Sequence, residues 1–104
     1  MKVRVKEGIA LYNHRRKIKN AKIGKPPNYK KLNIQKVGIM LYGGDSSAAK
    51  YKSVAVSMHL MITGKATSIR LEFIQMLCET FGIDANFLLG FDSIHDKEFN
   101  KILN

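Results

Sequence analysis

The sequence predicts a single helix-rich domain, for three reasons. Its 104 residues suffice for one modest hydrophobic core and are too few for two. Apolar residues recur three and four positions apart in several segments, which is the period of an amphipathic helix. Glycine or proline stands between these segments, where each expected helix would end.

The first expected helix runs from Val3 to about Lys22, with Val5, Ile9 and Tyr12 at helical spacing. Its second half contains five Lys or Arg residues and no acid. Because like charges on one helix repel each other, we favour the interpretation that phosphate groups neutralise them. The alternative is a solvated face that serves only solubility.

A linker and a short second helix are expected next. Two adjacent prolines in residues 24–31 cannot continue the first helix, and they predict a short extended linker over 22–32. A short helix is expected over 33–42, with Asn33 as its N-cap and Gly43 at its end. The GGDSS that follows lacks the GKS or GKT of a phosphate loop, so a turn is expected there.

Residues 46–62 leave two structures open. Apolar residues occupy every second position from Val54 to Ile62, which suits a β-strand. Val54, Met58 and Met61 also fall four and three positions apart, which suits a helix buried on one side. Periodicity alone does not decide between the two.

The clearest helix is expected over 68–81. Its apolar stripe comprises Ile69, Phe73, Met76, Leu77 and Phe81. Thr67 or Ser68 is the expected N-cap, and Gly82 is expected to end the helix in the left-handed conformation. One further helical turn is expected over 85–89, with Asp84 as its N-cap.

The last segment, residues 92–104, is expected to form either a final helix or a partner-binding tail. Ser93 is a candidate cap at its start. Its apolar residues, which would form one stripe, are Ile94, Phe99, Ile102 and Leu103.

The charge is distributed unevenly along the chain. Residues 1–70 contain sixteen Lys or Arg residues and two acids, whereas residues 71–104 contain two and six. We therefore expect opposite faces or ends of opposite charge. The basic part favours binding to nucleic acid or an anionic surface, because each phosphate that Lys or Arg neutralises releases condensed counterions.

No enzyme activity, metal or cofactor is predicted. The single cysteine, Cys78, excludes an internal disulfide, and its place beside an apolar stripe predicts a small buried hydrophobe. The three histidines lack the spacing of a zinc site. No apolar run is long enough to span a membrane and no signal peptide is found, so a cytoplasmic protein without membrane contact is expected.

Two stretches resemble the Xre or lambda-repressor-like helix-turn-helix family, MHLMITGK at 58–65 and FGIDANFLLG at 81–90. The resemblance covers roughly residues 32–91. It implies a recognition helix over about 53–62 and a positioning helix over 34–42. The expected fold is then all-α, a five-helix lambda-repressor-like helix-turn-helix domain over 1–91, followed by an acidic tail or an extra C-terminal helix.

The sequence departs from the family in two ways. Residues 43–52 separate the paired helices, whereas about four residues are usual in the family, so the recognition helix starts earlier or a loop is inserted. The positions that the family usually places on base edges become Ala55, Val56 and Leu60. None of these side chains can make the bidentate hydrogen bonds that distinguish bases.

The resemblance implies double-stranded DNA binding by a transcriptional regulator of the repressor type, sequence-specific or semi-specific. Candidates for contacts with bases are Lys50, Lys52, Ser53, Ser57 and His59. Candidates for contacts with phosphates are Arg15, Arg16, Lys17, Lys19, Lys22, Lys30, Lys31, Lys36, Lys65 and Arg70.

Binding mainly through phosphates is one alternative to base reading, and a protein-interaction or structural module on the same scaffold is another. RNA binding is a further alternative. A homodimer through Phe99, Ile102 and Leu103 of the tail is expected, unless these residues only pack against the last two helices.

Overall fold

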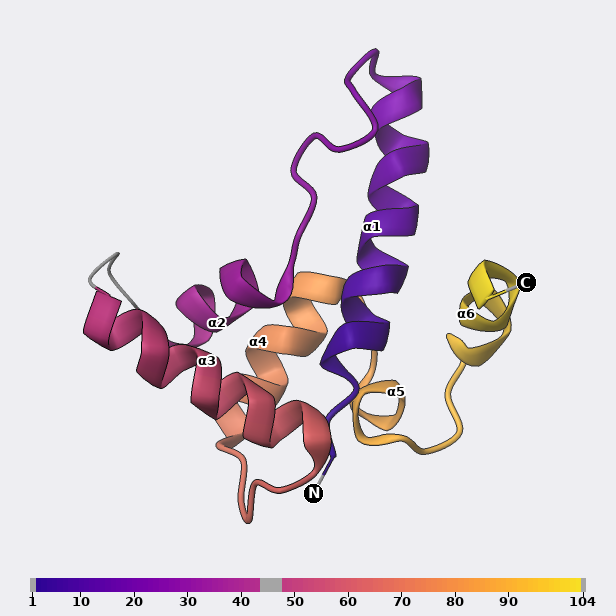
Figure 1. Ribbon diagram of the computed structural model, residues 1–104. Helices are drawn as coiled ribbons and strands as arrows, with labels where there is room; N and C mark the ends of the chain where they lie inside the picture. Colours follow the sequence, from indigo (N-terminus) through magenta and orange to yellow (C-terminus); the bar gives the residue numbers. More distant parts are fainter. Residues whose placement is uncertain (1, 44–47, 104) are drawn as a thin grey trace.

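The chain folds as an all-α domain. The computed structural model describes residues 2–43 and 48–103, and for 48–53 it describes the backbone only; no strand occurs in these ranges. The helices are α1 (Val5–Lys22), α2 (Ile34–Tyr42), α3 (Ala48–Thr63), α4 (Leu71–Phe81), α5 (Ala85–Leu89) and α6 (Asp96–Leu103), shown in Figure 1. None of these helices combines the length and the apolar character that crossing a membrane requires.

Helix α1 is longer than the body on which it packs. Its first half buries Val5, Ile9 and Leu11, whereas the only buried residue of its second half is Asn20. In Figure 1 this second half stands clear of the other helices, and the chain that follows returns beside it. We call residues 16–32, which comprise the projecting half of α1 and the returning loop, the arm.

Aromatic and aliphatic side chains from the remaining helices close the core around the first half of α1. Phe81 of α4 and Phe87 of α5 are fully buried. Phe99 of α6 packs edge-on against Phe87, with 5.5 Å between the ring centroids. The guanidinium of Arg4 lies 4.3 Å from the Phe87 ring centroid, so the start of the chain is also held against α5.

Two helix pairs approach so closely that only glycine fits between them. A Cβ on Gly8 would lie 2.5 Å from Cδ2 of Phe81, where α1 packs on α4. A Cβ on Gly38 would lie 2.6 Å from Cγ1 of Val54, where α2 packs on α3. These glycines fix how near α4 lies to α1 and α3 to α2.

Several expectations from the sequence are confirmed. The Asn33 side chain accepts a hydrogen bond of 2.8 Å from the Lys36 N–H at the start of α2, and Gly43 ends that helix in the left-handed conformation. Asp84 caps α5 in the same way through the Phe87 N–H. Gly82 ends α4 with a φ of 65°.

Residues 54–62 belong to a helix, so the strand alternative is wrong. Val54, Met58 and Met61 are buried and Val56 and Leu60 are exposed, as one buried side of a helix requires. Helix α3 begins at Ala48, earlier than the 53 expected from the family, so the longer helix is the correct alternative.

The expected start of the fourth helix at Ser68 is wrong. Helix α4 begins at Leu71 after Arg70, and neither Thr67 nor Ser68 caps it. Residues 67–70 instead carry the chain from the end of α3 to the start of α4 (Figure 1). Ile69 is half-buried and packs on the core from this connection rather than from a helix.

The tail forms a helix, but its expected apolar stripe is only half correct. Phe99 is buried and Ile102 is partly buried. Ile94 precedes α6 and is 84% exposed, and Leu103 is 68% exposed. Ser93 acts in the turn before α6, where its hydroxyl accepts a hydrogen bond from the His95 N–H.

Replacing Gly8 with alanine should destabilise the protein by about 1 kcal/mol. Overpacking against the buried Phe81 ring costs about 1–3 kcal/mol, which exceeds the gain of about 1 kcal/mol from removing a helical glycine. The free energy of unfolding is measured in urea for Gly8→Ala, Phe81→Leu and the double variant. The Gly8→Ala loss should shrink in the Phe81→Leu background, and a stabilising Gly8→Ala would contradict the close approach.

Candidate nucleic-acid interface

The loop of the arm is fastened to α1 by two asparagines that lie two helical turns apart on one face. Asn13 pairs with the backbone of Leu32, donating to its carbonyl and accepting from its N–H at 2.9 Å each. Asn20 donates to the carbonyls of Tyr29 at 2.8 Å and Pro27 at 3.3 Å. The loop is therefore held along the helix at its middle and at its end.

Three cations surround one aromatic ring on the arm. The Arg16 guanidinium lies 5.4 Å from the Tyr29 ring centroid, and the amines of Lys25 and Lys30 lie 5.3 and 5.6 Å from it. Nε of Arg16 is buried and has no hydrogen-bond partner among the described residues. We call Arg16, Lys25, Tyr29 and Lys30 the Tyr29 cluster.

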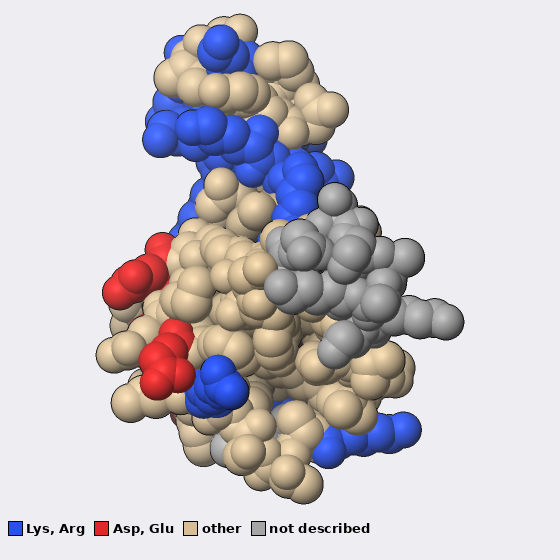
Figure 2. All heavy atoms as spheres, turned by 90° about the vertical axis from the view of Figure 1, so that its left-hand side faces the viewer, with Lys and Arg blue, Asp and Glu red and all other residues tan. Residues whose placement is uncertain are grey.

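The stretch of sequence that forms the Tyr29 cluster contains no carboxylate, and Glu79 of α4 lines a hollow with Arg16 on the side toward the body. The sequence contains no Asp or Glu from residue 8 to residue 44. Figure 2 shows Lys and Arg gathered over the projecting part of the molecule, while the acids in view lie lower, on the body. The arm is thus a concentrated positive feature rather than a mixture of charges.

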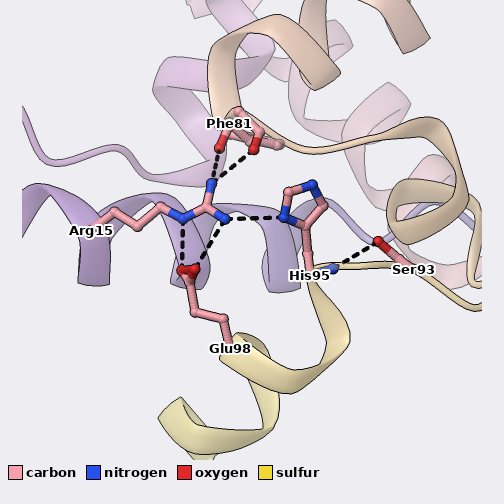
Figure 3. A network of polar contacts seen from close by, with 6 residues as sticks. Arg15, Phe81, Ser93, His95 and Glu98 are labelled. Atoms are coloured by element: carbon pink, nitrogen blue, oxygen red, sulfur yellow. Dashed lines mark hydrogen bonds and ion pairs between the residues drawn. The ribbon is translucent and has the colours of Figure 1, made fainter.

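The neighbouring Arg15 has a structural role instead. Its Nε and Nη2 donate to the two carboxylate oxygens of Glu98 at 2.7 and 3.2 Å, and its Nη1 donates to the carbonyls of Phe81 and Gly82 (Figure 3). Nη2 also lies 3.1 Å from Nδ1 of His95. Because arginine has no acceptor, His95 must accept there. Arg15 thereby joins α1 to α4 and α6.

The contacts of Arg15 change the acidity of its partner. The hydrogen bond from Arg15 outweighs the effect of partial burial and, with the positive charge of Arg15, holds the pKa of Glu98 below its ordinary value. Glu98 is therefore stabilised as the carboxylate, and α6 is held to α1 by a bidentate ion pair.

The other cations expected at phosphates fall into two regions. One region is the arm and its base, with the exposed Lys17, Lys19, Lys22, Lys30, Lys31 and Lys36. Nζ of Lys36 donates to the Lys31 carbonyl at 3.1 Å, which links α2 to the arm. The other region is the connection between α3 and α4, with the exposed Lys65 and Arg70.

The residues expected at base edges do not converge. The side chains of Lys50, Lys52 and Ser53 lie outside the described part of the chain. Ser57 and His59 are two positions apart on α3, which separates them by roughly 200° around the helix. Ser57 is half-buried and faces a depression beside α4, whereas His59 is exposed and faces a cavity beside α1 and α2.

The outer face of α3 between these two residues is apolar in its described part. Val56 is 59% exposed and Leu60 is 38% exposed. These are two of the positions that the family resemblance places against DNA bases. Neither side chain can donate or accept a hydrogen bond at a base edge.

Sequence reasoning missed Asn13 and Asn20, although their spacing of seven residues places them on one face of a helix. It also treated Arg15 and Arg16 alike. Among the described residues, no group of His, Cys, Asp and Glu could hold a metal ion. Burial, and secondarily the charges of Asp84 and Glu79, raises the pKa of the half-buried Cys78 thiol, which disfavours a reactive thiolate.

Comparison of the chain with protein-family models, with curated proteins and with solved structures finds no match.

Acidification should weaken the contribution of Glu98 to stability. The pKa of Glu98 is lower in the folded protein than in the unfolded chain. Its stabilisation is therefore fully present at pH values above the pKa of the unfolded chain, and it is lost as the pH falls through the pKa of the folded protein. The free energy of unfolding of wild type minus that of Glu98→Gln should be about 1 kcal/mol near pH 6 and should shrink toward about pH 3. Urea unfolding across this range measures it, and a constant difference would contradict the ion pair.

Proposed function

We propose that the protein binds double-stranded DNA chiefly through phosphate contacts made by the arm, as a regulator of the repressor type. The observation that carries the proposal is the Tyr29 cluster, three cations around one ring, in a stretch of sequence that contains no acid. Each cation contributes to attraction of a polyanion, and their gathering raises the local potential.

The half-buried Arg16 supports a phosphate as the group that completes the Tyr29 cluster. A phosphate beside its guanidinium would supply acceptors for the terminal N–H groups and a negative charge. Arginine binds phosphate well because its planar group offers several donors in a fixed geometry.

The shape of the arm supports contact with an extended partner. Asn13 and Asn20 hold its loop against α1, so little flexibility would be lost when the arm binds. The exposed Lys17, Lys19 and Lys22 lie on the same projecting half of the helix. In Figure 1 the arm extends away from α3. On this proposal the arm and α3 contact successive parts of one duplex.

On this proposal, α2 and α3 form the helix-turn-helix pair that the family resemblance implies, and binding is weakly sequence-specific. Val56 and Leu60, on the outer face of α3, offer only apolar contact, for example with a thymine methyl group. Phosphate contacts position a protein on DNA but carry no direct sequence information. A homodimer through the tail would rest on the exposed Leu103, since Phe99 is buried within its own chain.

A protein-interaction module is the second candidate, and the exposed Val56 and Leu60 are the observation that favours it. Apolar residues at the centre of a helix face suit a protein groove better than base edges. RNA binding is less favoured, because single-stranded recognition uses several stacking aromatics and Tyr29 is the arm's one aromatic residue.

Neutralising the Tyr29 cluster should weaken duplex binding on every sequence. The variant Arg16→Gln/Lys25→Gln/Lys30→Gln should lower the magnitude of the slope of log affinity against log salt by up to about 3, about one per lost phosphate contact. Affinity is measured with random duplexes at several salt concentrations. Ser57→Ala and His59→Ala should leave the sequence preference unchanged.

The matched control is Lys2→Gln/Lys97→Gln/Lys101→Gln, which removes three exposed cations outside the arm and gives the same net charge. It should retain most of the affinity and the slope. Equal losses in the two triple variants would contradict a role for the arm. Absence of duplex binding by the wild type at low salt would exclude DNA and favour the protein-interaction module.

A further inference from the structure

A second feature, separate from the arm, is a cavity of about 450 Å³ between α1, α2 and α3. Its walls are mainly apolar and include Ile34, Val54, Met58 and Ile62. Its volume lies within the range of about 300–1,000 Å³ found for small-molecule sites in proteins. Its lining residues Lys6, Gln35 and His59 are exposed, so the cavity opens to solvent rather than lying inside the core.

Three polar side chains accompany these walls, Lys6 from α1, Gln35 from α2 and His59 from α3. None of the three makes a side-chain hydrogen bond or ion pair with another described residue. Thr63, which also lines the cavity, instead donates its hydroxyl to the His59 carbonyl at 2.8 Å. Three separate helices therefore present unused polar groups at one apolar cavity.

The charge at the cavity indicates the kind of molecule that fits. Among the described lining residues, Lys6 carries the only fixed charge and none is an acid. An anionic group would pair with the Lys6 amine and could take hydrogen bonds from the Gln35 amide and a ring N–H of His59. A cation would meet Lys6 without compensation.

We propose that this cavity binds a small amphipathic organic anion, with its acidic head at Lys6 and its apolar body against Val54 and Met58. The bound molecule would contact α1, α2 and α3 together. Because it would bind only the folded arrangement, it would stabilise the relative placement of these helices. The cavity does not include residues of the arm, so this proposal can be tested separately from DNA binding.

Octanoate is a suitable probe, with octanol and octylammonium as neutral and cationic matches of the same chain length. Binding is followed on the full chain through the methyl NMR signals of Met58, Ile34 and Ile62. Octanoate should shift these signals saturably. Octanol should bind more weakly, and octylammonium should bind weakest. Equal binding of the three probes, or no saturable shift with octanoate, would overturn the proposal.

Variants locate the site. Lys6→Gln should weaken octanoate roughly tenfold, through loss of the charged partner, and should bring its affinity to that of octanol. Lys2→Gln removes an exposed cation that does not line the cavity and should have no effect. Ala55→Trp, at an exposed lining position, should fill the cavity and block all three probes.

Helical circular dichroism verifies that each variant is folded. Should Ala55→Trp not fold, the comparison of Lys6→Gln with Lys2→Gln still decides the outcome. Equal octanoate binding in Lys6→Gln and wild type would contradict the assigned head-group site.

Discussion

The guanidinium of Arg15 is the contact on which the arrangement of the helices depends. It binds the carbonyls at the end of α4 and the carboxylate of Glu98 on α6, more than sixty residues away in sequence (Figure 3). It also divides α1, because the helix contributes Val5, Ile9 and Leu11 to the core before Arg15 and projects from the body after it (Figure 1). One cation of the basic region is thereby used for folding, and the acidic tail supplies its counter-charge.

Beyond Arg15, α1 no longer packs on the body of the domain, and the returning loop packs beside it instead. Asn13 and Asn20 satisfy loop backbone groups that would otherwise depend on water. The loop in turn brings Lys25 and Lys30 beside Arg16. The like charges of the arm are therefore held in place by hydrogen bonds rather than by acids, and this makes the arm suited to a polyanion.

Local rules predicted much of the fold, and long-range contacts account for the rest. Asn33 and Asp84 are caps whose partners lie three residues away, so sequence alone identified them. Arg15 and Arg16 are adjacent and chemically identical, yet one faces α4 and α6 and the other faces the loop. That difference arises from partners distant in the chain. The cavity beside Lys6 could not be predicted either, because three separate helices form it.

The arm as the principal contact with DNA is the central claim, and the footprint of a duplex on the protein tests it most directly. A 15N-labelled sample is titrated with a random-sequence duplex at low salt, and backbone amide signals are followed. The largest changes should fall at residues 16–32, with smaller changes on α3. Changes confined to Val54–Thr63 with an unaffected arm, or no changes at all, would contradict the account.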